Sequence, residues 1–178
     1  MSIRRLPVHP NLDQLKHQAK DLFAAFRAGD PTVIEEFREH HPDKIDPASA
    51  KLADAQLVLA RSYQASSWTR LVQAVELIDA IWEDDLETVR ALVTHNRHLL
   101  YEDALIRTDS NWGPPMTYAA NVGRDRIIQM LHGLGAQDHR SALDAQCSKA
   151  KSAPRKCCMR YSAIRCQEMA RSADRLIL

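Results

Sequence analysis

The feature that most constrains how this chain can fold is an internal repeat in its second half. The segments at residues 77–100 and 109–138 each read as a short helix, a turn and a second helix. Five positions recur at a distance of 39 residues, and they pair Ala80, Ile81, Asp84, Val89 and Leu92 with Ala119, Ala120, Gly123, Ile128 and Leu131. A third, partial copy follows 27 residues after the second, with Leu143, Cys147 and Ala150. Repetition at such a period is the signature of a solenoid, so we expect stacked helix pairs.

The second copy carries a family pattern. Its sequence TYAANVGRDRIIQMLHGLGA resembles the ankyrin repeat, which has paired alanines, a glycine, paired leucines and a final Gly-Ala. The small Ala119 and Ala120 let neighbouring helix pairs approach closely, and Gly123 permits the turn between helices. Asp84 stands where glycine is usual, and the spacings of 39 and 27 residues differ from the usual period of about 33. The resemblance covers residues 78–138 and implies a non-enzymatic module that binds another protein.

The N-terminal half also reads as helical. Apolar residues recur at helical spacing after Asn11, which can cap a helix that Gly29 would end. Asp30 followed by Pro31 can start a second helix, and two more are expected at about 48–63 and after Ser66 or Ser67. No stretch alternates as a strand does. We therefore predict an all-α fold: an ankyrin-like helical repeat array with an N-terminal multi-helix segment.

The predicted organisation has four parts. Residues 1–10 are expected to form a flexible N-terminus, 11–77 a segment of about four helices, 78–148 the ankyrin-like repeats and 149–178 a basic tail. The N-terminal segment resembles a helical leader found before ankyrin-type arrays in some bacterial proteins. In that leader the spacer between the tyrosine and the serine-tryptophan contains glycine, whereas this chain has Gln64.

Charge divides the chain unevenly. Residues 149–178 carry a net charge of +6 and residues 1–148 a net charge of −5, which leaves +1 for the whole chain. All four cysteines fall at the end of the sequence, at Cys147, Cys157, Cys158 and Cys166. Two interpretations of residues 149–178 stay open, a genuine basic tail or a product of a shifted reading frame, because the repeat pattern stops abruptly. As a genuine tail, it offers an alternative function, the binding of nucleic acid or another anionic surface.

Several classes of function lack a signal. No apolar run reaches the ~18 residues of a membrane span, and the N-terminus has no apolar segment of a secretory signal, so we expect a cytoplasmic protein. The chain has no phosphate-binding loop, dinucleotide fingerprint or nucleophile elbow. Its eight histidines form no HExxH pattern. We predict no enzymatic activity, no cofactor and no metal site.

Ankyrin arrays bind their partners through loop tips and first helices. The candidate partner-binding residues are accordingly Asn111, Trp112, Tyr118, Asn121 and Arg124. Trp112 is the best candidate for an anchor, because a loop-tip aromatic can act as a binding hot spot. The alternative is that Trp112 packs over Pro114 and Pro115. The sequence identifies neither the partner, the biological process nor the oligomeric state.

Overall fold

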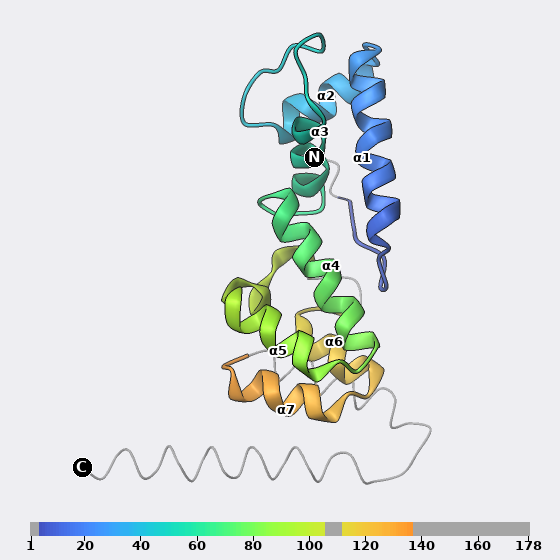
Figure 1. The fold of residues 1–178 in the computed structure, drawn as a ribbon. Coiled ribbons are helices and arrows are strands. Elements are labelled where there is room, and N and C mark those ends of the chain that lie inside the picture. Colours follow the sequence, from blue (N-terminus) through green and yellow to red (C-terminus); the bar gives the residue numbers. More distant parts are fainter. Residues whose placement is uncertain (1–3, 106–111, 137–178) are drawn as a thin grey trace, which may run out of the picture.

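The computed structural model describes residues 4–105 and 112–136, and in these ranges the chain folds into helices and loops without a strand (Figure 1). The α-helices are α1 (Leu12–Arg27), α2 (Pro31–His40), α3 (Leu52–Ser62), α4 (Trp68–Trp82), α5 (Leu86–His95), α6 (Pro115–Val122) and α7 (Asp125–Gly133). Two short 3-10 helices, η1 (Arg97–Tyr101) and η2 (Asp103–Leu105), follow α5. The all-α prediction is confirmed for this part of the chain. Asn111, the third copy, the cysteines and residues 149–178 lie outside the described residues.

Three of the predicted helix starts in the N-terminal half, at Asn11, Asp30 and Ser67, are confirmed by their caps. The Asn11 side chain accepts a hydrogen bond from the backbone N–H of Gln14 at 2.9 Å. Asp30 accepts one from the N–H of Thr32 at 2.8 Å, and Ser67 caps α4. Each cap satisfies a backbone donor that the first helical turn leaves without a partner.

The third helix begins later than predicted. We expected it from about residue 48, but α3 starts at Leu52. The carboxylate of Asp54 accepts the backbone N–H of Lys51 at 2.7 Å, which places the helix boundary at this residue. Residues 46–49 form a turn instead, in which the N–H of Ser49 donates to the carbonyl of Asp46 at 3.0 Å.

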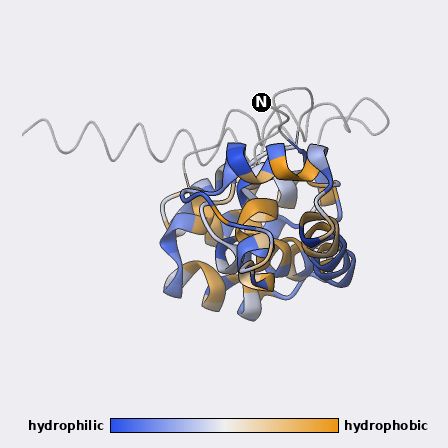
Figure 2. Ribbon diagram, turned by 90° about the horizontal axis from the view of Figure 1, so that it is seen from above, coloured by the Kyte–Doolittle hydropathy of each residue, from blue (hydrophilic) through white to orange (hydrophobic). Residues whose placement is uncertain are grey.

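Two hydrophobic cores hold the helices together, and α4 belongs to both. The first core joins α1, α2 and α3 and includes Leu71 and Val75 of α4. The second core joins α5, α6 and α7 and includes Leu77 and Ile78 of α4. Figure 1 shows α4 between the two groups, and Figure 2 shows hydrophobic residues along one side of most helices. Residue 77, where we placed a domain boundary, therefore lies inside one continuous helix.

Residues 4–10, which we call the N-terminal strap, are packed against the helices. We expected a flexible end here, and this expectation needs correction. Leu6 is 3% exposed and belongs to the first core, while Val8 packs against the second. The backbone N–H of Arg4 donates to the carbonyl of Ser62 at 2.8 Å. An apolar residue every second position lets an extended segment bury one side, which explains the packing.

The second half contains two stacked helix pairs. Within each pair, α4 packs on α5 and α6 packs on α7; between pairs, α4 packs on α6 and α5 on α7. The second helices begin 39 residues apart, at Leu86 and Asp125. The helix turns are also alike, with φ of +61° at Asp84 and +74° at Gly123. After each turn a backbone N–H donates to the carbonyl five residues earlier, from Asp85 to Ala80 at 2.9 Å and from Arg124 to Ala119 at 2.8 Å.

Two residues adopt the left-handed backbone conformation although they are not glycine. Gln64 has φ of +67° and Asp84 has φ of +61°, and no other described residue except glycine has a positive φ. Both are positions where the resembled patterns have glycine. The chain keeps the turn at each position, at the cost of placing a Cβ in a region that favours glycine.

A substitution at Ala120 tests whether the two helix pairs approach each other closely at α6. Ala119 and Ala120 are 0% and 2% exposed, and their helix α6 lies against both α4 and α7. Ala120→Leu should overpack this contact and lower the free energy of unfolding by about 1–3 kcal/mol. Ala91→Leu on the exposed face of α5 is the matched control, with an expected change of less than about 0.5 kcal/mol. Denaturant titration measures both, and equal midpoints would contradict the close packing.

A pair of glycines tests the left-handed turn. No atom lies within 4 Å of a Cβ built at Gly123 or at Gly133, but only Gly123 has a positive φ, of +74°. Gly123→Ala should therefore destabilise the protein by about 1 kcal/mol through backbone strain alone. Gly133→Ala in α7 should leave stability unchanged or raise it by up to about 1 kcal/mol. Thermal unfolding of the two variants checks the sign, and a stabilising Gly123→Ala would refute the assignment of the turn.

Candidate functional site

A row of aromatic rings lies where the N-terminal strap, the end of α4 and the start of α6 meet. The His9 ring stacks on Trp82 with centroids 4.8 Å apart and planes at 14°. Trp82 and Trp112 are also nearly parallel, with centroids 6.2 Å apart and planes at 9°. Trp112 then meets Tyr118 at 4.9 Å and 58°. We call these four residues the aromatic row.

Each ring of the aromatic row is held by a different part of the chain. Trp82 is the last residue of α4, and Tyr118 lies in the middle of α6. Trp112 precedes α6 and packs against the second core. His9 is fixed from the strap, because its Nε2 lies 2.9 Å from an Asp79 carboxylate oxygen on α4. The row therefore forms only when the strap and the two helix pairs are assembled.

The structure places the candidate partner-binding residues at different depths. Trp112 and Arg124 are partly exposed, whereas Tyr118 is 1% exposed and Asn121 is 2% exposed. The expectation that Tyr118 and Asn121 face a partner is therefore corrected. The cause is that α6 lies against α4, α7 and η1, which buries seven of its eight residues. Trp112 packs on Tyr118 and Trp82, a contact that we had not predicted.

Arg124 has a structural contact that sequence reasoning missed. Its guanidinium donates to the carbonyl of Ile81 at 3.3 Å and to the carbonyl of Trp82. These are the last two carbonyls of α4, and that of Ile81 also accepts the backbone N–H of Asp84 at 3.3 Å. A cation at this end also complements the helix dipole. Arg124 thus joins the turn of one helix pair to the end of the preceding first helix.

Trp82 and His9 were not among the predicted site residues. A signal for Trp82 was available, because it occupies the position 39 residues before Asn121 in the repeat. His9 had no such signal, since it contacts α4 across 70 residues of sequence. The indole N–H of Trp82 is buried and has no hydrogen-bond partner in the described part of the chain. Buried donors usually have a partner, so this one marks the row as chemically unusual.

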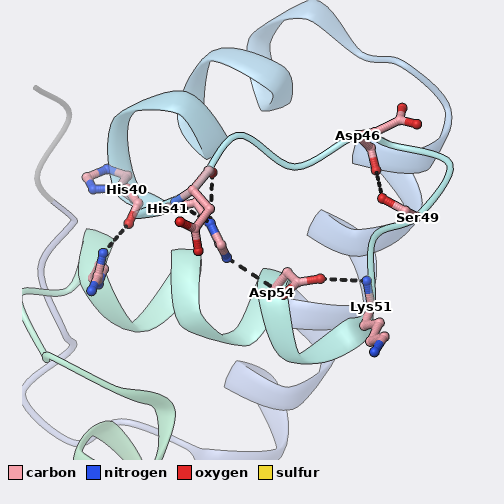
Figure 3. A network of polar contacts seen from close by, with 8 residues as sticks. His40, His41, Asp46, Ser49, Lys51 and Asp54 are labelled. Atoms are coloured by element: carbon pink, nitrogen blue, oxygen red, sulfur yellow. Dashed lines mark hydrogen bonds and ion pairs between the residues drawn. The ribbon is translucent and has the colours of Figure 1, made fainter.

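The histidines at the end of α2 belong to a structural network. His41 has a 5% exposed side chain, and its Nε2 lies 3.6 Å from a carboxylate oxygen of Asp54 (Figure 3). The Arg61 guanidinium donates to the carbonyl of His40 at 3.1 Å. These contacts attach the segment after α2 to α3, as Figure 3 shows. In residues 4–105 and 112–136, no three histidine, cysteine or acidic side chains are grouped to hold a metal ion.

The acidic run at residues 83–87 serves the start of α5. Asp85 accepts hydrogen bonds from the backbone N–H and the hydroxyl of Thr88, at 3.0 Å and 2.6 Å. These bonds hold the pKa of the Asp85 carboxyl below its usual value, and the hydroxyl contributes most. Asp30 at the start of α2 has a lowered pKa for the same reason, through Thr32. The two carboxylates are helix caps, as the sequence predicted for Asp30.

A buried ion pair fixes the loop between the two helix pairs. Glu102 is 1% exposed, and its carboxylate accepts the Nε–H of Arg70 at 2.8 Å. The second guanidinium nitrogen lies 2.7 Å from the same oxygen. Arg70 also donates to the hydroxyl of Ser66 at 3.1 Å. Because the contacts of Arg70 with Glu102 and Ser66 all lie within the fold, we assign the ion pair a structural role.

Comparisons of the chain with known proteins found no match. No protein-family model, no curated protein and no solved structure matches the chain. Within the described ranges, no helix has the length and apolar character needed to cross a bilayer.

Arg124 can be tested as a structural residue rather than a contact residue. Arg124→Ala removes both hydrogen bonds to the end of α4, so the free energy of unfolding should fall by about 1–2 kcal/mol. Arg126→Ala is the matched control, because Arg126 is exposed on α7 and a surface change costs less than about 0.5 kcal/mol. Urea titration distinguishes the two variants. Equal stability of both would return Arg124 to the list of partner contacts.

Proposed function

We propose that this chain is a non-enzymatic protein-binding module of the ankyrin-repeat type. The observation that carries the proposal is the stacking of two helix pairs, α4–α5 on α6–α7, with like turns at Asp84 and Gly123. In such arrays each unit is stable through its neighbours, and loops at one edge are free to diverge for binding. The resemblance of residues 78–138 to ankyrin repeats supports the same conclusion.

The binding surface that we propose is the exposed side of the aromatic row, centred on Trp112. Trp112 and Trp82 are both partly exposed, and the His9 side chain is 53% exposed. Aromatic side chains are enriched among binding hot spots, because they bury a large area with few rotatable bonds. Tyr118 supports Trp112 from below, since it is buried and in contact with that ring. Tyr118 and Asn121 are not part of this proposed surface.

The alternative function, binding of an anionic surface through the basic tail, remains a prediction. It concerns residues 149–178, which lie outside the described residues. The described part of the chain contains no feature that favours it over protein binding. We propose no catalytic residue, cofactor or metal for the module.

Site-specific crosslinking tests the proposed surface. A photo-crosslinking amino acid at position 112 should capture a partner in cells of the source organism, and the same amino acid at Lys20 should not. Lys20 is the control because it is exposed on α1, one of the helices of the first core. It also lies far from Trp112 in the sequence. With the captured partner purified, Trp112→Ala should weaken binding by about 2 kcal/mol, roughly thirtyfold.

The control for that affinity measurement is Lys20→Ala, for which binding should stay within about twofold. The thermal midpoint of each variant must be recorded, because Trp112 also packs against the second core. A folded Trp112→Ala variant with full affinity would contradict the proposed surface. Capture at position 20 in place of position 112 would move the binding site to another face.

A further inference from the structure

The N-terminal strap crosses the whole length of the two cores. At its start, the Arg4 guanidinium lies 2.8 Å from a Glu36 carboxylate oxygen of α2. In its middle, Leu6 enters the first core and Val8 packs against the second. At its end, His9 pairs with Asp79 and covers one face of Trp82. An extended segment therefore already occupies a surface that runs from α2 to the aromatic row.

The side-chain ion pairs at the two ends of the strap are partly exposed. The side chains of Arg4 and His9 are 36% and 53% exposed, and those of Glu36 and Asp79 are 19% and 44% exposed. Ion pairs exposed in this way contribute little, because water screens them. The strap also lies outside every helix, and its backbone bends at Val8 and His9. Such segments open locally at a lower free energy than the helices that they cover.

We propose that the strap is a displaceable occupant of the surface that runs from α2 to Trp82, next to the binding surface proposed at Trp112, and that the partner supplies an extended segment of the same chemistry. This inference rests on the proposed function. The partner segment has a basic residue, then two apolar residues separated by one position, then an aromatic or imidazole ring. The pattern follows Arg4, Leu6, Val8 and His9 of the strap itself.

The surface beneath the strap explains that chemistry. Its two ends are acidic, with Glu36 at one and Asp79 at the other, so it favours a basic segment. Between them it is apolar, and alternate residues of an extended segment point to the same side. When His9 leaves Trp82, a partner ring can take its place and stack on Trp82.

The strap lowers the affinity of every competing segment. As part of the same chain, it is present at an effective concentration in the millimolar range. A free peptide must therefore displace it, and the apparent affinity falls by the fraction of molecules in which the surface is open. Weakening the strap without unfolding the helices should raise that fraction and so raise the affinity.

A peptide titration with the full-length protein tests the inference. The probe is a fluorescent, N-acetylated peptide with the sequence of residues 4–11, RRLPVHPN. The acetyl group preserves the backbone amide that bonds to Ser62. The double variant Leu6→Asp/His9→Ala should bind this peptide at least tenfold more tightly than the unaltered chain, as measured by anisotropy. The matched control is Gln14→Asp/His17→Ala, which alters two exposed residues of α1 and should bind like the unaltered chain.

Other outcomes of this titration would contradict the proposal that the strap can be displaced. A double variant with unchanged helicity and thermal midpoint, but without tighter peptide binding, would show that the surface accepts no second segment. If the double variant loses cooperative unfolding, the milder His9→Ala variant decides the question: tighter peptide binding would support the proposal, and unchanged binding would overturn it. A peptide that carries the same two substitutions should not bind to any variant. Because this assay contains no partner protein, its failure leaves the test at Trp112 unaffected.

Discussion

The structure depends on one helix that packs into two cores. Leu71 and Val75 of α4 face the first core, while Leu77 and Ile78 face the second. A 15-residue helix can do this because it turns by about 100° per residue, so successive apolar residues face different directions. The N-terminal helices and the stacked helix pairs are therefore mechanically continuous. Any change that unwinds α4 should loosen both cores together.

The same continuity assembles the candidate site. His9 comes from the strap, Trp82 from the end of α4 and Trp112 from the segment that precedes α6. Arg124 holds the end of α4 in place by bonding to its last carbonyls. A row of rings built from three distant segments is rigid only if all three are fixed. For Trp82 and Trp112, which stay in place when the strap is displaced, this preorganisation reduces the entropy that the binding surface loses when a partner arrives.

The turns show how the repeat tolerates changes in sequence. Asp84 and Gly123 adopt nearly the same left-handed conformation, and each turn is closed by a like backbone hydrogen bond. Aspartate accepts this conformation more readily than most residues, because its short side chain can bond locally. The aspartate that follows caps α5, which stabilises the exit from the turn. Backbone geometry is thus retained where the glycine of the resembled pattern is lost.

The local signals of the sequence were sufficient for the helices but not for the site. Asn11, Asp30 and Ser67 marked helix starts correctly, because a cap bonds to a backbone N–H only two or three residues away. The paired alanines and Gly123 indicated a buried helix contact and a turn, and both are present. Trp112 was predicted as a loop-tip aromatic that could anchor a partner, and the structure leaves it partly exposed.

Tertiary structure alone decided which polar and aromatic residues meet. The burial of Tyr118 and Asn121 follows from helices packed on several sides of α6, which no local pattern encodes. The contact of His9 with Asp79 spans 70 residues, and that of Arg124 with Ile81 spans 43. The packing of the strap is likewise a property of the surface beneath it. Helix caps and periodicity are short-range, so the sequence determined the elements, whereas long-range packing determined the aromatic row.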